Sequence, residues 1–332
     1  MGEKRTLKLH MPLAVRIKSR KIGGLYLLKG RYQMDMMLEF MLSQYAELPL
    51  PQTTLHSWLE KWINEQTERC TDNAFAAGFP WKETGLPQSY FLQRKLCIDG
   101  RYFLTGARYK GGDMNRPFID IVASSAEIDD SVLKAVSREW ADLKPQHIRQ
   151  LTPGNNAVQG MADQLVYASC LFNQPHYHDD DLTLKPASST DFDWCQHALL
   201  EAYQHSWSTI PALSGSLCSV SNEDLGNHIS KGHTYIVQEQ GVQVGLIIFE
   251  KENVAFLKGY RISEEVILPA FRGRSLASRA QCLLRNHLSH FSREACPITG
   301  TILPENFPSI KTAEKAGRTC VLRYEFLPVI FN

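Results

Sequence analysis

The segment SEEVILPAFRGRSLASRA, residues 263–280, constrains the fold of this chain more than any other stretch. It begins with an apolar run typical of a buried strand, turns at Pro269 and Gly273, and continues with helical periodicity. A helix that packs its apolar stripe on a sheet has its first N–H groups fixed at the turn, where no helical carbonyl accepts from them. We therefore predict a strand, a turn and a helix that gather main-chain donors suited to a phosphate group.

A second segment with clear boundary residues, PENFPSIKTAEKAG, follows at residues 304–317. Pro304 closes a predicted strand, Pro308 suits the first turn of a helix, and Gly317 suits its C-terminal cap. The two segments predict two successive strand–helix units.

Length and composition favour a soluble protein of two domains. The chain has 332 residues, more than one domain usually needs, and no run of apolar residues is long enough to cross a membrane. The first ten residues carry charges where an export signal needs apolar residues, so we expect a cytoplasmic protein that does not bind membranes.

Cysteine spacing and charge exclude two kinds of site. The eight cysteines form no C-x-x-C pair and no Cys/His pattern that suits zinc, so we expect no metal. The net charge is +1, and the nine Lys/Arg residues within residues 1–31 are more typical of a solvated edge strand than of a polyanion site. Nucleic acid is not an expected partner.

The order of predicted elements occurs twice. Helices, a meander of strands and a further helix fill residues 1–173, and a similar order returns over residues 182–332. Between them, residues 174–181, QPHYHDDD, are polar enough for a linker. His176 and His178 beside three aspartates could catch a metal, but nothing in the segment fixes a coordination geometry, and we take it as the domain boundary. We predict a duplicated α+β fold with a mixed, mostly antiparallel sheet flanked by helices.

The C-terminal motifs resemble those of the GNAT superfamily of acyl-CoA-dependent N-acyltransferases. That family carries a strand of the type V-x-P followed by R/Q-x-x-G-x-G/A, and here Ile267-Leu268-Pro269 leads to the segment RGRSLA, residues 272–277. The Asn, small residue and closing Gly of the family's next helix are matched by Asn306, Ser309 and Gly317. The resemblance covers about residues 182–326.

The resemblance implies a sheet whose two middle strands splay apart around the pantetheine of acetyl-CoA or another acyl-CoA. Backbone groups of Ile267 and Leu268 would bind the pantetheine, residues 272–277 would hold the pyrophosphate, and Asn306 would bind the pantetheine arm or a water. The residues expected to contact the cofactor are Ile267, Leu268, Pro269, Arg272, Gly273, Arg274, Ser275, Leu276, Ala277, Asn306 and Ser309.

The implied activity is transfer of an acetyl group to a primary amine of a small molecule or peptide, by direct attack on the thioester. The alternative is a non-catalytic module that senses acyl-CoA or holds a partner. Removal of a proton from the amine needs a carboxylate, and Glu264 and Glu265 at the head of the strand are the candidates. A homodimer stays open.

Two positions depart from the family pattern. Ser275 stands where the family usually has Gly, and it is acceptable if its φ is negative. Ala313 replaces the tyrosine that often protonates the leaving thiolate, so Tyr324, Tyr260 or water would have to serve.

The N-terminal half resembles the same fold more faintly. Residues 118–124 would be the equivalent strand and residues 130–143 the helix that follows it. Between them Glu127, Asp129 and Asp130 would repel a phosphate. We therefore expect this half to bind no CoA and to have a structural or substrate-shaping role.

Overall fold

The computed structural model describes residues 31–171, 175–290 and 296–331. The basic stretch predicted as an edge strand lies outside these residues except for Arg31, which begins a helix over residues 31–44. None of the described helices is both long and apolar enough to cross a membrane.

Eleven strands form one continuous mixed sheet, in the order β1-β2-β3-β4-β11-β5-β10-β9-β8-β7-β6. The pairs β3–β4 and β9–β10 are parallel, and every other neighbouring pair is antiparallel. The predicted mixed, mostly antiparallel sheet is confirmed. The strands are β1 Arg94–Ile98, β2 Arg101–Tyr109, β3 Pro117–Ser124, β4 His147–Pro153, β5 Met161–Cys170, β6 Leu182–Pro186, β7 Thr234–Glu239, β8 Val242–Lys251, β9 Tyr260–Ile267, β10 Pro297–Ile302 and β11 Thr319–Leu327.

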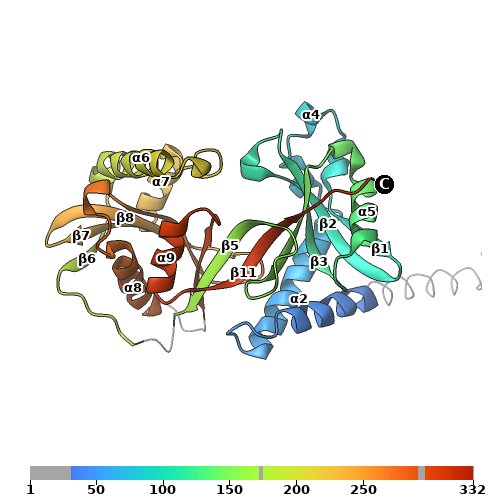
Figure 1. Ribbon diagram of the computed structural model, residues 1–332, viewed down its shortest axis with the longest axis horizontal. Coiled ribbons are helices and arrows are strands. Elements are labelled where there is room, and N and C mark those ends of the chain that lie inside the picture. Colours follow the sequence, from blue (N-terminus) through green and yellow to red (C-terminus); the bar gives the residue numbers. More distant parts are fainter. Residues whose placement is uncertain (1–30, 172–174, 291–295, 332) are drawn as a thin grey trace, which may run out of the picture.

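The two strands at the centre of the sheet are exchanged between the halves of the sequence. Strand β5, which precedes residues 174–181, pairs with β10, whereas the C-terminal strand β11 pairs with β4 on one side and β5 on the other. In Figure 1 these strands run between two lobes, one holding β1 to β4 and the other β6 to β10. We keep the two-half organisation, with a boundary at residues 174–181, as a proposal. In this arrangement each half contributes one central strand that pairs with strands of the other half.

Helices cover both faces of the C-terminal lobe. Helices α6 Phe192–Thr209 and α7 Asn222–Ser230 pack on one face through residues such as Leu246 and Ile248 of β8. Helix α8 Leu276–Ser289 packs on the opposite face, where Ile247 and Phe249 point, because side chains alternate along a strand. The last helix is α9 Phe307–Lys315.

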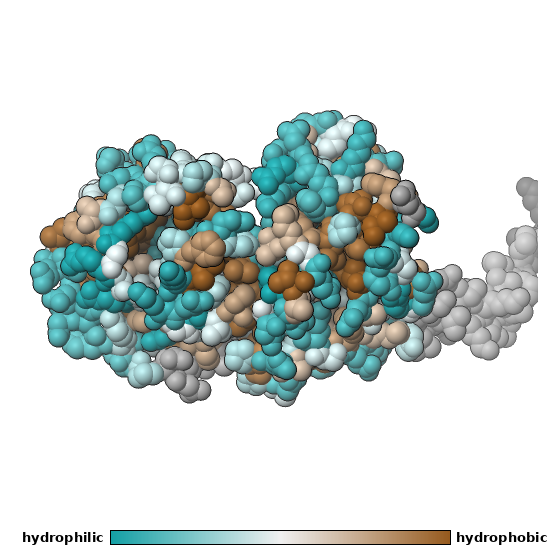
Figure 2. Space-filling model, viewed as in Figure 1, coloured by the Kyte–Doolittle hydropathy of each residue, from teal (hydrophilic) through white to brown (hydrophobic). Residues whose placement is uncertain are grey.

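The N-terminal lobe is layered in the same way. The helix over residues 31–44 and α2 Gln52–Glu68 share an apolar cluster with one face of the sheet, which includes Leu104 and Val166. Helices α3 Asn73–Ala77 and α5 Asp130–Glu139 share a second apolar cluster with residues of β2, β3 and β4, and the short helix α4 Trp81–Thr84 lies beside it. Figure 2 shows that hydrophilic residues cover much of the visible surface, with apolar patches in both lobes.

One predicted pair of strands is a single strand. The apolar residues of segments 254–261 and 264–268 predict two strands, but β9 runs from Tyr260 to Ile267, and residues 254–257 form only an isolated bridge. The pairing with β8 shifts by one residue at Ser263, because Ile262 faces Phe249 while Glu264 faces Ile248. This bulge re-aims the side chains of the glutamate pair that follows it.

Candidate functional site

A groove opens where the parallel strands β9 and β10 part. Their pairing is limited to Tyr260 with Ile298 and Arg261 with Thr299. Beyond these residues a cavity of about 410 Å³ lies between residues 262–267 of β9 and residues 300–303 at the end of β10. The splayed strands expected from the sequence are therefore present, and the two predicted motifs lie at this cavity.

The turn before α8 presents unused main-chain donors to this groove. Gly273 has φ +82°, and helix α8 begins at Leu276 without a side-chain cap. Within the described part of the chain, the backbone amides of Gly273 to Ala277 donate no hydrogen bond. Gly273, Ser275, Leu276 and Ala277 all line the cavity. Free amides at the positive end of a helix are a binding site for phosphate oxygens.

Ser275 does not have the negative φ under which a serine is acceptable at this turn. Its φ is +58°, in the left-handed region that costs a non-glycine residue roughly 1–2 kcal/mol. The glycine usual at this position of the family motif would avoid that cost. The Oγ of Ser275 accepts a hydrogen bond of 3.1 Å from Lys315 Nζ, which brings a cation to the turn. No motif marked Lys315 in the sequence.

The two arginines of the motif are not free to pair with phosphate. Arg272 donates to the carbonyl oxygens of Ile267 and Ala202, both at 3.0 Å, so it joins β9 to α6. Burial lowers the pKa of Arg272. Arg274 forms a 2.7 Å ion pair with Glu239 and is not among the residues that line the cavity. Both guanidinium groups are thus engaged by acceptors of the chain itself, and contact of Arg272 and Arg274 with the cofactor stays a prediction.

Glu264 is a buried carboxylate at the wall of the groove. One of its oxygens accepts from the Tyr203 hydroxyl at 2.5 Å, and the other accepts from the Val220 amide at 2.8 Å. Burial raises the pKa of Glu264 to about 7, although both hydrogen bonds lower it. A carboxyl group with this pKa is ionised often enough near neutral pH to accept a proton.

Glu265 lines the same groove from the opposite face of β9. Gln281 of α8 donates to it at 2.6 Å, and burial raises its pKa to about 7. Its other oxygen and the Nη1 of Arg318 are buried and have no hydrogen-bond partner among the described residues. Because β9 is exposed along its splayed edge, both members of the glutamate pair reach the cavity.

Ile267 ends β9 and Leu268 follows it, and these are the two residues whose backbone groups are expected to bind the pantetheine. The amide of Leu268 already donates to the Val244 oxygen at 2.9 Å. Residues of an antiparallel strand alternate in direction, so the Ile267 amide faces the other edge, toward the groove. Pro269 lies in the short helix η6 Pro269–Phe271, and neither Leu268 nor Pro269 lines the cavity.

The second motif contributes to the opposite wall. Asn306 caps α9 by accepting a 3.3 Å hydrogen bond from the Ser309 amide, and both residues line the cavity. Its side-chain oxygen is therefore engaged in the helix cap, and its amide nitrogen remains for a ligand. Ala313 is fully buried under β10.

The tyrosines named as substitute acids lie elsewhere. Tyr324 is in contact with Arg149, whose guanidinium carbon lies 4.3 Å from the ring centre, and it does not line the groove. Tyr260 precedes the splay and is absent from the cavity wall as well. Tyr203 is the only tyrosine among the described residues that line the cavity, and its hydroxyl donates a hydrogen bond to Glu264.

The described residues contain no group of three or more His, Cys, Asp or Glu side chains placed to hold a metal ion. Asp179 of the acidic segment instead binds Arg279 of α8 through two hydrogen bonds of 2.6 and 2.7 Å. The segment predicted as a linker is thus attached to α8.

No protein-family model matches the sequence, and no curated protein matches it. Solved structures similar to this chain include a GCN5-related N-acetyltransferase from Sphaerobacter thermophilus, with 12% identity, a TM-score of 0.45 and coverage of 78% of this chain and 95% of that one. A GNAT-family acetyltransferase from Colwellia psychrerythraea is 10% identical, with a TM-score of 0.47 and coverage of 81% of this chain and 96% of that one. A GNAT-family acetyltransferase from Bacillus anthracis is 20% identical, with a TM-score of 0.33 and coverage of 46% of this chain and 96% of that one.

Proposed function

We propose that this protein is an N-acyltransferase that transfers the acetyl group of acetyl-CoA, or a related acyl group, to a primary amine. The observation that carries the proposal is the joining of two features in one cavity. Unsatisfied amides at the start of α8 lie at the groove, and a buried carboxylate with a raised pKa, Glu264, lies in its wall. The first suits a diphosphate, and the second suits removal of a proton from an ammonium group.

Each part of an acyl-CoA would contact a different set of residues along the groove. The amides of residues 273–277 would bind the pyrophosphate, with Lys315 adding positive charge nearby. The Ile267 amide and the Asn306 side-chain nitrogen would bind the amides of the pantetheine. The thioester would then lie toward Glu264, where β9 bulges.

The reaction needs one proton acceptor and one leaving group. Glu264 takes a proton from the acceptor's ammonium group, directly or through water, and the neutral amine attacks the thioester carbonyl. The new C–N bond forms as the C–S bond breaks, the nitrogen releases its second proton to solvent to give the neutral amide, and CoA leaves as a thiolate that takes a proton from solvent. Because a thiol is acidic enough to leave in this way, the buried Ala313 does not prevent the reaction.

The test is to incubate the protein with acetyl-CoA and a panel of small amines, polyamines and peptides while free thiol is measured. Thiol release that depends on one class of amine, with matching formation of the acetylated amine, supports the proposal. Tight CoA binding with no turnover on any amine would instead favour the sensing module.

A further inference from the structure

A second pocket lies in the N-terminal lobe, at the place that corresponds to the groove. The parallel strands β3 and β4 pair at three positions, the last being Asp120 with Arg149, and then part. Beyond them is a cavity of about 300 Å³ between residues 121–124 of β3, residues 150–152 of β4 and the end of the helix over residues 31–44. This volume is at the lower limit of those that hold small molecules.

The helix that follows β3 cannot receive a phosphate as α8 can. The side chain of Asp129 accepts from the Val132 amide at 3.0 Å and so caps the first turn of α5. Arg101 binds the same carboxylate at 2.7 Å and keeps its pKa well below the ordinary value. The helix N-terminus is therefore occupied by the chain's own anion.

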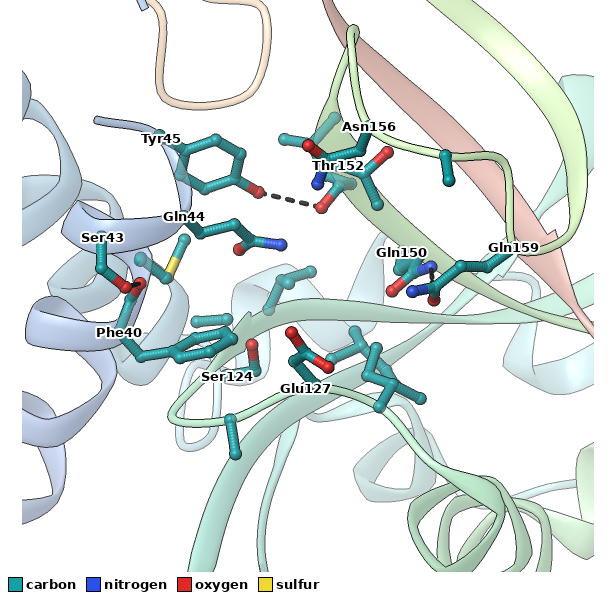
Figure 3. A pocket seen from close by; sticks show the side chains of 18 residues that line it. Phe40, Ser43, Gln44, Tyr45, Ser124, Glu127, Gln150, Thr152, Asn156 and Gln159 are labelled. Carbon is teal, nitrogen blue, oxygen red and sulfur yellow. Dashed lines mark hydrogen bonds between the residues drawn. The ribbon is translucent and has the colours of Figure 1, made fainter. Parts of the chain in front are cut away.

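The lining of the second pocket is polar and carries no positive side chain among the described residues. Figure 3 shows Gln44, Ser124 and Glu127 directed toward a common space, with Gln150 and Gln159 across from them. Glu127 is the only charged side chain among the described residues that line it, and the aromatic residues Phe40 and Tyr45 add to the wall. Amides and hydroxyls offer both donors and acceptors, and the single carboxylate favours a cation over an anion.

The floor of the pocket is held rigid from the C-terminal strand. Gln150 is buried, and its amide nitrogen donates to Gln159 at 3.1 Å and to Glu325 of β11 at 3.4 Å. No described residue donates to the Gln150 side-chain oxygen. This oxygen is not among the buried atoms that lack a hydrogen-bond partner, so it is open to the pocket and can accept a hydrogen bond from a ligand donor.

We propose that this pocket binds a second ligand, distinct from acyl-CoA: a small molecule that presents hydroxyl or amide groups and bears no charge or a single positive charge. Amino sugars and amino acid amides have this shared chemistry. The proposal does not depend on the acyltransferase activity, because none of its residues lines the groove.

Calorimetric titration of the full chain tests the proposal, with glucosamine, glucose and glutaminamide as probes and glucosamine 6-phosphate as the anionic counterpart. We expect saturable binding of glucosamine or glutaminamide at millimolar concentrations or below, with the phosphorylated sugar bound at least about tenfold more weakly. Comparing the affinities for glucosamine and glutaminamide shows whether the ligand is an amino sugar or an amino acid amide.

Three variants connect binding to this pocket. Glu127→Gln should weaken the binding of a cationic probe about tenfold and leave the affinity for glucose unchanged. Gln44→Leu should weaken the binding of every probe that binds the wild type. Ala157→Trp adds an indole at an exposed position of the wall and should block the pocket without affecting the fold. Gly273→Asp, at the groove, should leave the affinity for every probe of this pocket unchanged.

The proposal is overturned if no probe binds saturably, or if glucosamine 6-phosphate binds as tightly as glucosamine. Binding that survives Ala157→Trp would also overturn it, because the ligand would then lie elsewhere.

Discussion

The hydroxyl of Tyr203 donates a 2.5 Å hydrogen bond to the carboxylate of Glu264, which joins α6 to the bulged strand β9 at the wall of the groove. The contact fixes the orientation of a buried carboxylate whose pKa is raised to about 7. If Glu264 is the proposed base, this contact would orient it before an acceptor arrives, as catalysis by proton removal requires.

Replacing Glu264 by Gln should lower kcat/KM by roughly 10²- to 10⁴-fold, because the base is lost while the shape is kept. In the wild type, kcat/KM should rise with pH up to about 7, since only the ionised carboxylate accepts a proton. That limb of the pH–rate profile should be absent from the variant. The matched control is Glu265→Gln, which should keep the limb; if Glu264→Gln keeps it instead, Glu264 is not the base.

The raised pKa of Glu265 should also make the free energy of unfolding depend on pH. Its pKa rises through burial from 4.5 to about 7, so the folded chain holds a proton that the unfolded chain releases in this window. This contribution to the free energy of unfolding is complete below pH 4.5 and is lost as the pH rises through 7. At 1.36 kcal/mol per pKa unit, Glu265→Gln should reduce the loss of stability between pH 5 and pH 8 by about 2–3 kcal/mol. Urea unfolding at both pH values measures it, and an unchanged difference would contradict the assignment.

The left-handed conformation of Ser275 makes a prediction about the turn itself. Ser275→Gly should keep CoA affinity and have a free energy of unfolding at or above that of the wild type, because glycine adopts φ +58° without strain. Ser275→Val should cost roughly 1–2 kcal/mol of unfolding free energy and weaken CoA binding, since a β-branched side chain is strained there. Thermal unfolding and calorimetry compare the two variants, and equal behaviour would show that the turn does not need this conformation.

Sequence reasoning located the groove because its signals are local. Pro269, Gly273 and Gly317 each mark a turn or helix end through backbone conformation, and the structure places positive φ at both glycines. The strand before the turn and the helix after it followed from apolar periodicity. Turns and helix ends of this kind depend on residues that are adjacent in the sequence, so the sequence alone predicts them.

What the sequence did not reveal depends on contacts between distant residues. Arg272 and Arg274 have acceptors on α6 and β7, at Ala202 and Glu239, which no motif indicates. The exchange of β5 and β11 places Tyr324 beside Arg149 rather than at the groove. A strand's neighbours are set by the topology of the whole sheet, and alternation along the strand does not encode them.

The exchanged strand β11 carries a buried ion pair whose loss should be costly. Arg323 binds Glu325 at 2.6 Å, and Glu325 is fully buried. Arg323→Met should lower the free energy of unfolding by about 3–5 kcal/mol, because it leaves a buried carboxylate unpaired. The double variant Arg323→Met/Glu325→Leu should recover most of that loss in urea unfolding. Equal losses in both variants would mean that the bonds from Arg323 to the oxygens of Gly154 and Asn156 dominate instead.

The role of the turn before α8 as the diphosphate site is tested by calorimetric titration of CoA into two Gly273 variants. Gly273 has φ +82°, and no heavy atom lies within 4 Å of the position that a β-carbon would take, so Asp and Asn both fit in space and tolerate this backbone. If the amides of residues 273–277 hold the diphosphate, Gly273→Asp should weaken CoA at least about 100-fold through charge repulsion, while Gly273→Asn should stay within about tenfold of the wild type. Equal CoA affinity in the wild type and Gly273→Asp would show that the diphosphate does not bind at this turn.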